Sequence, residues 1–563
     1  ADSLTACTLS VSACGTSLAA PHVAGSVAVL RAPDSFPSES QCRTVSRLKG
    51  AGKDIIDPRN GAPRPRINLG LAVTLITTLL SLPLAFLLVR YQFPGKALLN
   101  GLILIPMVLP PFVGAIGMRQ LMARFGSLNL LLLHLGVIDQ PIDWLGGGSF
   151  WGVGVLEALH LYPIMYLNPP AALANVDPSL EEAAKNMGAN GFRLFRTVTF
   201  PLMLPGYFAG AIIVFIWAFT DLGTPLVFEY REVIAVQIFN MVTDLHQNPM
   251  GYAFVVVVIA LTLFFFYLSK RILGGGRYEM LGRGHVTSAA RPASAPITAL
   301  AYAFVLGISA LALIPHLGVF LTSLAKRWFL SVLPNEFTWQ FYQQLFSHDL
   351  ALLSIKNSLL LSTFSTLIDI VLGVTVAYLL ARKRVPGRNV LDALAMLPLA
   401  LPGLVLAFGY VAAFSATPLD ARGNPVPLLV IAYAVRRLPY MVRAAYAGFQ
   451  QTSVALEEAS INLGASPLRT LFQITLPLVF ANLIAGAVLS FSFAMLEVSD
   501  SLILAAKEPY YPITKAIYAL LQRIADGPYI ASALGMLGLL LLALSLFIAG
   551  RFFGRRMGEL FRA

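Results

Sequence analysis

The chain has 563 residues, of which 57% are hydrophobic and only 12% are charged, and its mean hydropathy is +0.73. A soluble protein of this length needs more charge to cover its surface, so the composition argues against that class and favours a membrane protein. The formal net charge is +12, but the basic residues cluster at the ends of apolar runs and form no stripe with aromatic residues. This placement argues against nucleic acid as a partner and is typical of cytoplasmic loops between membrane spans.

Residues 1–66 differ from the rest of the chain. They contain all three cysteines, and their only apolar stretch, residues 23–30, is too short to cross a bilayer. Residues 15–25 closely resemble the nucleophile segment of subtilisin-like serine proteases, which implies Ser17 as the attacking serine. That chemistry needs a His base and an orienting Asp, and the chain has no His-Gly-(Thr/Ser) or Asp-Thr-Gly motif. We therefore expect a truncated, non-catalytic segment, and a serine protease fragment is a distant alternative.

From residue 67 onward, apolar runs of membrane-spanning length alternate with short polar loops, and about 11 spans are predicted. Five precede a basic linker at 276–296, which we expect to be cytoplasmic, and six follow it. The span predicted at 427–449 is the least regular because three arginines interrupt it. The predicted spans are 67–89, 98–122, 150–172, 203–228 and 251–269, and then 297–325, 355–381, 391–415, 427–449, 479–505 and 530–550.

The two sets of spans are copies of one unit. Residues 181–189 read Glu-Glu-Ala-Ala-Lys-Asn-Met-Gly-Ala, and residues 457–465 read Glu-Glu-Ala-Ser-Ile-Asn-Leu-Gly-Ala, at an offset of 276 residues. Further upstream, residues 90–96 and 382–388 share an Arg…Pro-Gly-(Lys/Arg) pattern at an offset of 292. Internal repetition of this kind predicts two homologous domains, at 67–275 and 297–563.

Both copies share a longer motif: Glu-Ala-(Ala/Ser), three residues, Gly, nine residues, an aliphatic residue, any residue, and (Phe/Leu)-Pro. The motif resembles the cytoplasmic signature loop of binding-protein-dependent ABC-importer permeases, and the resemblance covers about residues 70–563. It implies an all-α polytopic protein of the bacterial inner membrane, with two type I transmembrane domains in tandem. It also implies that the loops dock on ATPase subunits through Glu181, Glu182, Ala183, Ala184 and Gly188, and through Glu457, Glu458, Ala459, Ser460 and Gly464.

The local sequence predicts a helix–turn–helix in the first of these loops. Pro178 suits a first helical turn, and the acids Glu181 and Glu182 suit its positive N-terminal end. Gly188 then ends the helix, because glycine tolerates left-handed geometry. A second short helix leads to Pro201, where the next span begins. An interfacial amphipathic helix without a partner is the alternative, and two equally spaced copies disfavour it.

The resemblance implies the permease subunit of an ATP-driven importer. Substrate would come from a periplasmic binding protein and cross by alternating access, driven by two copies of a separate ATPase. The chain has no Gly-x4-Gly-Lys-(Ser/Thr) loop, and we expect it to bind no cofactor. Among such permeases it looks most like the fused two-domain group for ferric iron, with thiamine, phosphonate and polyamine as alternative substrates. The residues behind this are Pro94-Gly95-Lys96 with Leu109-Pro110-Pro111, Pro386-Gly387-Arg388 with Leu401-Pro402-Gly403, and Arg436-Arg437-Leu438-Pro439-Tyr440.

Several acids lie within or beside the apolar runs, where a charged group usually faces the bundle interior or a cavity. Asp221 and Glu497 are equivalent in the repeat, and we predict that they flank a shared pathway toward its periplasmic end. Structural hydrogen bonds between helices are the alternative. No His, Cys and carboxylate cluster has the spacing of metal ligands, so no metal site is predicted. The other such residues are Glu157 with His160, Asp369 and Asp500.

Overall fold

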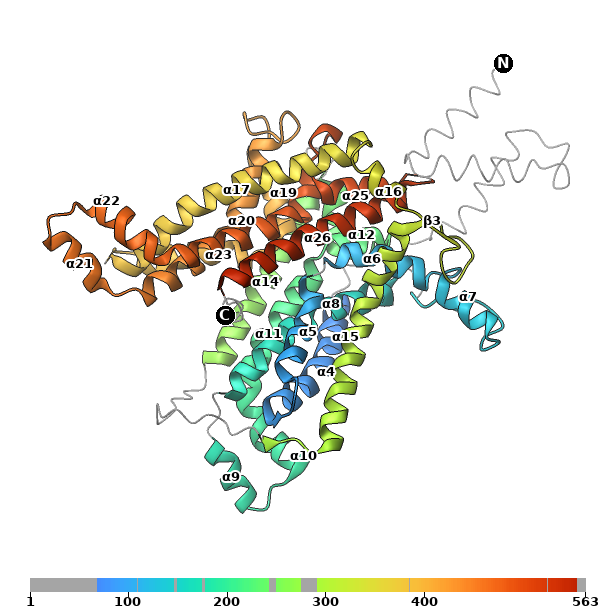
Figure 1. The fold of residues 1–563 in the computed structure, drawn as a ribbon, viewed down its shortest axis with the longest axis horizontal. Coiled ribbons are helices and arrows are strands. Elements are labelled where there is room, and N and C mark those ends of the chain that lie inside the picture. Colours follow the sequence, from blue (N-terminus) through green and yellow to red (C-terminus); the bar gives the residue numbers. More distant parts are fainter. Residues whose placement is uncertain are drawn as a thin grey trace. The chain divides into compact units, whose positions relative to one another are not determined.

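A computed structural model describes residues 68–553, apart from 109, 146–148, 175–177, 243–249, 275–290, 384 and 524. Ser17 and the whole subtilisin-like segment lie outside the described residues, as does most of the predicted linker. The described chain is almost entirely helical (Figure 1). A helix satisfies all its backbone hydrogen bonds internally, which is the condition for crossing hydrocarbon.

Apart from α7, which has no counterpart, the order of helices from α4 to α14 recurs from α17 to α26, and α15 and α16 lie between the two sets in the chain. Two-residue strands β1 and β2 pair in parallel, and β3 and β4 pair antiparallel. The first half contains α4 (Asn68–Arg90), β1 (Tyr91–Gln92), α5 (Lys96–Val108), α6 (Pro111–Met122), α7 (Ser127–His134), α8 (Phe150–Ala174), α9 (Pro178–Asn186), α10 (Gly191–Leu194), the π-helical turn η1 (Phe195–Thr199), α11 (Phe200–Thr220), α12 (Gly223–Val227), α13 (Ile234–Met241) and α14 (Met250–Gly274). The second half contains β2 (Arg291–Pro292), α15 (Ala295–Leu324), β3 (Ala325–Arg327), β4 (Glu336–Phe337), α16 (Gln340–Gln344), α17 (Asp349–Arg382), α18 (Arg388–Ala400), α19 (Gly403–Phe414), α20 (Val426–Gln451), α21 (Val454–Asn462), α22 (Pro467–Thr470), the π-helical turn η2 (Leu471–Thr475), α23 (Leu476–Met495), α24 (Ser499–Leu504), the 3-10 turn η3 (Glu508–Tyr510), α25 (Ile513–Leu521) and α26 (Gly527–Phe553).

Seven helices in the described part are long and apolar enough to cross a membrane, and two bent helix pairs raise the number to nine. The spans predicted at 98–122 and 391–415 correspond to these bent pairs, so the chain is helical there but sharply bent. α5 and α6 bend by 86°, and α18 and α19 by 101°. Prolines cause both breaks: Pro111 opens α6, and Leu401 before Pro402 is extended.

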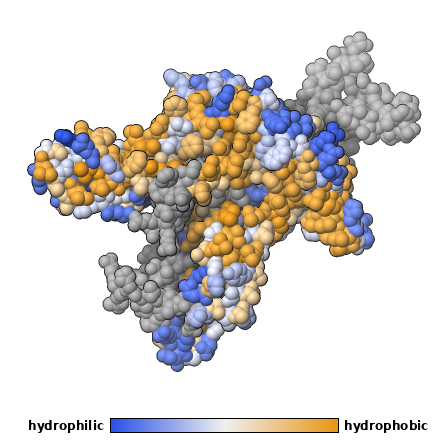
Figure 2. Space-filling model, viewed as in Figure 1, coloured by the Kyte–Doolittle hydropathy of each residue, from blue (hydrophilic) through white to orange (hydrophobic). Residues whose placement is uncertain are grey.

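The two spans predicted at 251–269 and 427–449 are helical, but one is too short and the other too charged to count among these nine. The apolar described part of α14, Met250–Phe265, is shorter than a span, and α20 carries Arg436, Arg437 and Arg443. The total of about 11 spans stays a prediction. Apolar side chains nevertheless cover much of the helices displayed in Figure 2, with polar ones gathered around α9. On α4, Leu71, Leu75 and Leu79 are exposed at a spacing of four residues, as on a helix face turned toward lipid.

Helix α15 belongs by sequence to the second half, but it packs against α5 and α6 of the first half and against α26. Four of its buried side chains share one apolar cluster with α4, α5 and α8: Ala301, Val305, Ile308 and Ala312. At the crossing with α6, a Cβ on Gly117 would overlap the carbonyl oxygen of Pro315, so the two backbones touch. Strand β2 adds to this attachment by pairing with β1.

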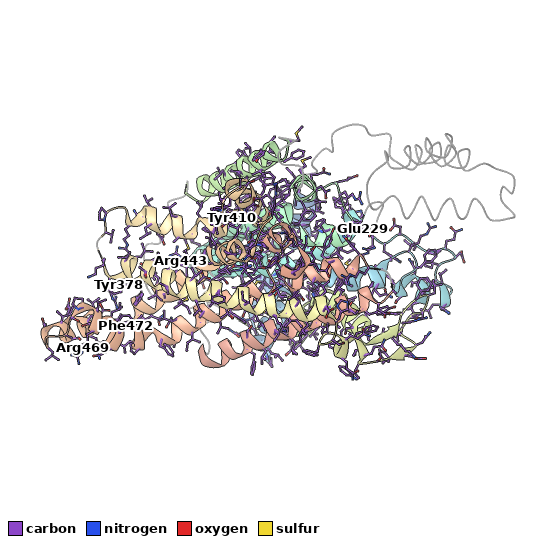
Figure 3. All side chains as sticks on the ribbon, turned by 90° about the horizontal axis from the view of Figure 1, so that it is seen from above. Glu229, Tyr378, Tyr410, Arg443, Arg469 and Phe472 are labelled. Atoms are coloured by element: carbon purple, nitrogen blue, oxygen red, sulfur yellow. The ribbon has the colours of Figure 1, made fainter. Side chains whose placement is uncertain are left out.

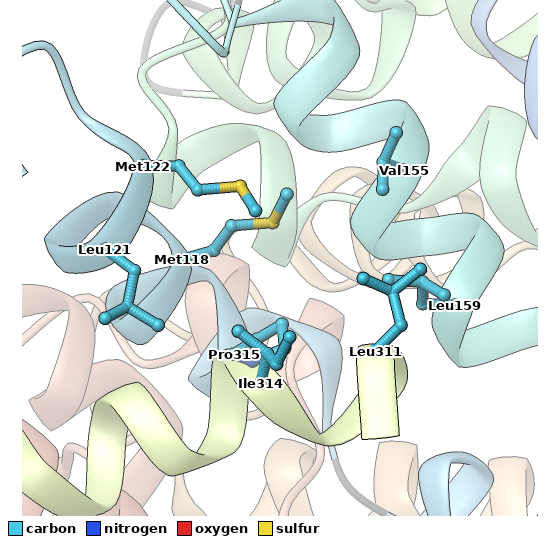
Figure 4. Close-up of a pocket in the computed structure, with 8 residues that line it drawn as sticks. All are labelled: Met118, Leu121, Met122, Val155, Leu159, Leu311, Ile314 and Pro315. Carbon is cyan, nitrogen blue, oxygen red and sulfur yellow. The ribbon is translucent and has the colours of Figure 1, made fainter. Parts of the chain in front are cut away.

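A small apolar pocket lies between α6, α8 and α15 (Figure 4). Only aliphatic and methionine side chains and one proline line it, among them Met118, Val155 and Leu311. It offers no polar group that would orient a ligand, so we treat it as imperfect packing beneath α15.

Candidate functional site

The signature loops form the predicted helix–turn–helix in both halves. Gly188 and Gly464 have φ of +85° and +91°, which confirms the left-handed geometry expected at these two helix ends. The N–H of Ala189 donates to the carbonyl of Ala184 at 2.9 Å, and the N–H of Ala465 donates to that of Ser460 at 3.1 Å. These bonds satisfy carbonyls that the helix end would otherwise leave open. We call α9 and α21 the docking helices.

Each docking helix has a buried and an exposed side. Glu181 and Glu457 are buried, whereas the following residues Glu182 and Glu458 are exposed. Ala183 and Ala459 are also exposed, so the small residues lie on the surface that faces away from the spans. Ala184 is buried, and its equivalent Ser460 hydrogen-bonds Thr470 at 2.9 Å.

The exposed side also carries large apolar residues that sequence reasoning missed. Met187 and Leu463 are 82% and 89% exposed and occupy equivalent positions of the repeat. Leu180 and Leu456, again equivalent, are about half exposed. A signal existed in the sequence: each pair keeps the same spacing from the first Glu of its motif. Apolar side chains exposed so fully at a helix tip favour a partner surface there.

An ion pair joins each docking helix to the C-terminal end of a span, α4 in the first half and α17 in the second. Glu181 pairs with Arg90, the last residue of α4, and it also accepts a hydrogen bond from Thr199 at 2.8 Å. Glu457 pairs with Arg382, the last residue of α17, at 2.8 Å. Neither arginine was predicted as a site residue, although both open the upstream repeat motif.

The second short helix of each loop runs without interruption into the next span. A π-helical turn joins α10 to α11 and α22 to α23, and it ends directly before the pairs Phe200-Pro201 and Leu476-Pro477. Because proline has no N–H to donate, the regular hydrogen-bond ladder cannot continue through it. Figure 3 shows the end of the second loop, where Arg469 and Phe472 project from α22 and η2.

Asp221 lies directly after α11 and is half buried. Its carboxylate accepts a hydrogen bond from the N–H of Thr224 at 2.9 Å, which holds the start of α12. Glu157 of α8, 2% exposed, lies beside Asp221 and Thr224. The first half therefore brings two acids together at this point.

The equivalent position in the second half is balanced by basic residues. Glu497 is 3% exposed, pairs with Arg436 at 3.2 Å and also pairs with Arg437. Asp369 and Asp500, both buried, lie near Arg437. Glu497 thus accommodates two of the three arginines that made α20 an irregular span, and the third, Arg443, is exposed and pairs with Asp392 at 3.4 Å.

The turns that carry the two acids meet. A Cβ on Gly223 would lie 2.9 Å from Cγ1 of Val498, so the segment after Asp221 contacts the segment after Glu497. The lining of a pathway by these acids stays a prediction. Among the described residues, no group of three or more His, Cys, Asp or Glu side chains is arranged to hold a metal ion.

The family model described as "Binding-protein-dependent transport system inner membrane component" matches residues 77–274 and 370–559. The chain belongs to this family. It is 30% identical over 493 residues to the ferric transport system permease protein FbpB of Actinobacillus pleuropneumoniae, which is 85% of this chain and 67% of that protein. The protein named FbpB 1 of Haemophilus influenzae is also 30% identical, over 76% of this chain and 66% of its own length. The crystal structure of a bacterial ABC transporter involved in the import of the acidic polysaccharide alginate is 18% identical, with a TM-score of 0.36, over 46% of this chain and 97% of that chain.

Both matches enclose a signature loop, so each half carries one copy of the family's domain. The chain is accordingly a multi-pass inner-membrane permease of a binding-protein-dependent transport system. The resemblance inferred from the sequence motifs is confirmed at the level of the family.

Proposed function

We propose that this permease imports ferric iron, driven by two copies of a separate ATPase subunit that bind its two docking helices. The observation that carries the ATPase part is the repeated exposed surface: Met187 and Leu463 protrude beside Glu182 and Glu458 in both halves. Two equivalent surfaces fit two copies of one partner.

The chemistry of this surface suits insertion into a groove. Each large apolar side chain that leaves water on binding contributes about 1.5–3 kcal/mol. The exposed Ala183 and Ala459 allow close approach, and the exposed glutamates offer charged contacts at the rim. The chain itself would bind no cofactor, and ATP would act only on the partner. When the two ATPase copies close on ATP, they would move both docking helices and switch the spans between inward-open and outward-open states.

The substrate proposal rests on two supports. The relatives named above are ferric transport permeases, and Asp221 is a half-buried acid in the turn where the two halves meet. A cation would find favourable charge there, whereas a phosphonate anion would meet like charge. Thiamine and polyamines are cationic alternatives. A periplasmic binding protein would deliver the substrate.

We also propose that Ser17 performs no proteolysis, because the chain has no motif for its His and Asp partners.

The ATPase part is tested by copurification from native membranes. The double variant M187E/L463E should insert normally but lose the ATPase, because charge replaces the apolar contacts. The matched control is L135E, since Leu135 is 65% exposed and lies far along the chain from either loop. Retention of the ATPase by M187E/L463E would remove the docking role.

The substrate is tested separately by uptake of radioactive ferric iron with the binding protein present. We expect excess unlabelled ferric iron to compete, and thiamine, a polyamine and a phosphonate to leave uptake unchanged. Uptake of one of those compounds in place of iron would overturn the substrate while leaving the ATPase proposal intact.

A further inference from the structure

The ion pairs Arg90–Glu181 and Arg382–Glu457 connect equivalent elements in both halves. The arginines are related by the 292-residue offset of the upstream motif, and the glutamates by the 276-residue offset of the signature loop. In the second half, the two side chains are only 7% and 10% exposed, and in the first half Glu181 is 6% and Arg90 27% exposed. A pair that occurs twice and is largely removed from water differs from the exposed ion pairs elsewhere on the chain.

Each ion pair joins a docking helix to a span, α4 or α17, with which that helix has few other contacts. The docking helix α9 packs mainly against α10 and η1, and α21 mainly against α22 and η2. Within the described residues, neither docking helix packs extensively on α4 or α17. The ion pair is therefore a direct link between the docking helix and α4 in the first half, or α17 in the second.

In each ion pair, one partner also forms a hydrogen bond with a third element. Arg382 donates from Nε to Glu457 and from a terminal nitrogen to the carbonyl of Thr452, both at 2.8 Å, and Thr452 caps the C-terminal end of α20. In the first half, Glu181 accepts from Thr199 of η1 in addition to Arg90. Each pair thus joins a docking helix to α4 or α17 and to one further element.

We propose that these two ion pairs are the links through which docking-helix movement reaches α4 and α17, so that Arg90 and Arg382 are positioning residues for coupling. The inference rests on the proposed docking function. It assigns different tasks to adjacent residues: Glu182 and Glu458 face the partner, and Glu181 and Glu457 face the spans. Charge-assisted bonds in a buried setting suit this task, because they resist separation more strongly than neutral ones.

The test measures movement in the assembled complex and needs no substrate. Spin labels are placed at Leu79 and Val371, which are 64% and 66% exposed and equivalent on α4 and α17. Native cysteines Cys7, Cys14 and Cys42 are replaced by serine. In the complex with the copurified ATPase, a non-hydrolysable ATP analogue should shift the distance between the labels. The variant R90Q/R382Q should keep the ATPase but lose most of that shift.

Two further variants separate coupling from folding. R90K/R382K keeps the positive charge and should retain the shift in distance. If Arg90 and Arg382 only filled space, the lysine and glutamine variants would behave alike. R523Q is the matched control, because it breaks the exposed pair with Glu508 and should leave the shift at the wild-type value. A full shift in R90Q/R382Q would overturn the proposal. Loss of the ATPase from R90Q/R382Q would also overturn the proposal, by showing that the ion pairs belong to the docking surface. The binding of the ATPase to M187E/L463E bears only on the proposed function.

Discussion

Asp221 and Glu497 are equivalent in the repeat, yet their surroundings differ in charge. Two guanidinium groups balance Glu497, whereas Asp221 lies beside another acid. The repeat therefore preserves the position of the acid and changes its neighbours. This difference follows from α20, which has Arg436 and Arg437 where the equivalent helix α8 has His160 and Leu161.

We expect Glu497→Gln to be far more destabilising than Asp221→Asn. Removal of one partner from a buried ion pair costs about 3–5 kcal/mol, because the other charge stays buried. An amide at 221 still offers an oxygen to the N–H of Thr224, so its cost should be about 1 kcal/mol or less. Thermal unfolding of the purified variants measures the difference. Equal shifts in Tm would contradict the structure's account of Glu497.

A second residue-scale prediction concerns the glycines that end the docking helices. The variant G188V/G464V forces a β-branched residue into left-handed geometry, at about 1–2 kcal/mol per position, although the space around each glycine is open. We expect insertion to persist and substrate uptake to fall. Gly307→Ala, a helical glycine that also has open space, is the control and should leave uptake unchanged. Wild-type uptake by the double variant would remove the need for this turn.

At the scale of elements, one helix crossing depends on two facing glycines, Gly117 of α6 and Gly318 of α15, whose backbones leave no room for a Cβ on either. Gly117 touches the backbone of α15, while its repeat equivalent Gly409 on α19 has nothing within 4 Å of where a Cβ would lie. Gly117→Val should therefore separate α6 from α15 and greatly reduce the amount of folded protein, since backbone cannot shift as a flexible side chain can. Gly409→Val should be tolerated. Gel filtration of both variants after solubilisation compares them, and similar profiles would contradict the crossing.

The sequence was informative about elements wherever one local rule applied. Uninterrupted apolar runs predicted α4, α15 and α26, and glycine predicted the ends of the docking helices. It was less informative where the outcome depended on distant partners. The bends before Pro111 and at Pro402 were not predicted, because their size depends on how the flanking helices pack, and the partial burial of Arg436 and Arg437 required Glu497, 60 residues beyond Arg437.

In the candidate site too, the sequence predicted local features but not contacts between residues that lie far apart in the chain. The repeated motif located both docking loops, because it is local. The partners of Glu181 and Glu457 were not predicted, because Arg90 and Arg382 are 91 and 75 residues away in the chain. Exposure of Met187 and Leu463 was also hidden, since a sequence pattern does not show whether an apolar residue faces the membrane or water.

At the scale of the molecule, α15 attaches the second half to the first. We expect the two halves to stay together after the connecting chain is cut. A protease site inserted between residues 276 and 290 should yield two fragments that copurify in mild detergent, because α15 still packs on α5 and α6. The same cut in a Gly117→Val background should release them. Separation of the fragments in the otherwise wild-type protein would show that the packing of α15 is too weak to hold the halves.

The position of α15 also bears on how the protein is made. Synthesis proceeds from the N-terminus, and domains generally fold in that order. Here the surface of α5 and α6 stays uncovered until residues 295–324 have left the ribosome and entered the membrane. During that interval, the first half exposes the backbone at Gly117 and the apolar faces that α15 will later cover. A chain stopped before residue 295 should accordingly be a preferred target of membrane quality-control proteases, and supplying residues 295–324 as a separate helix should protect it.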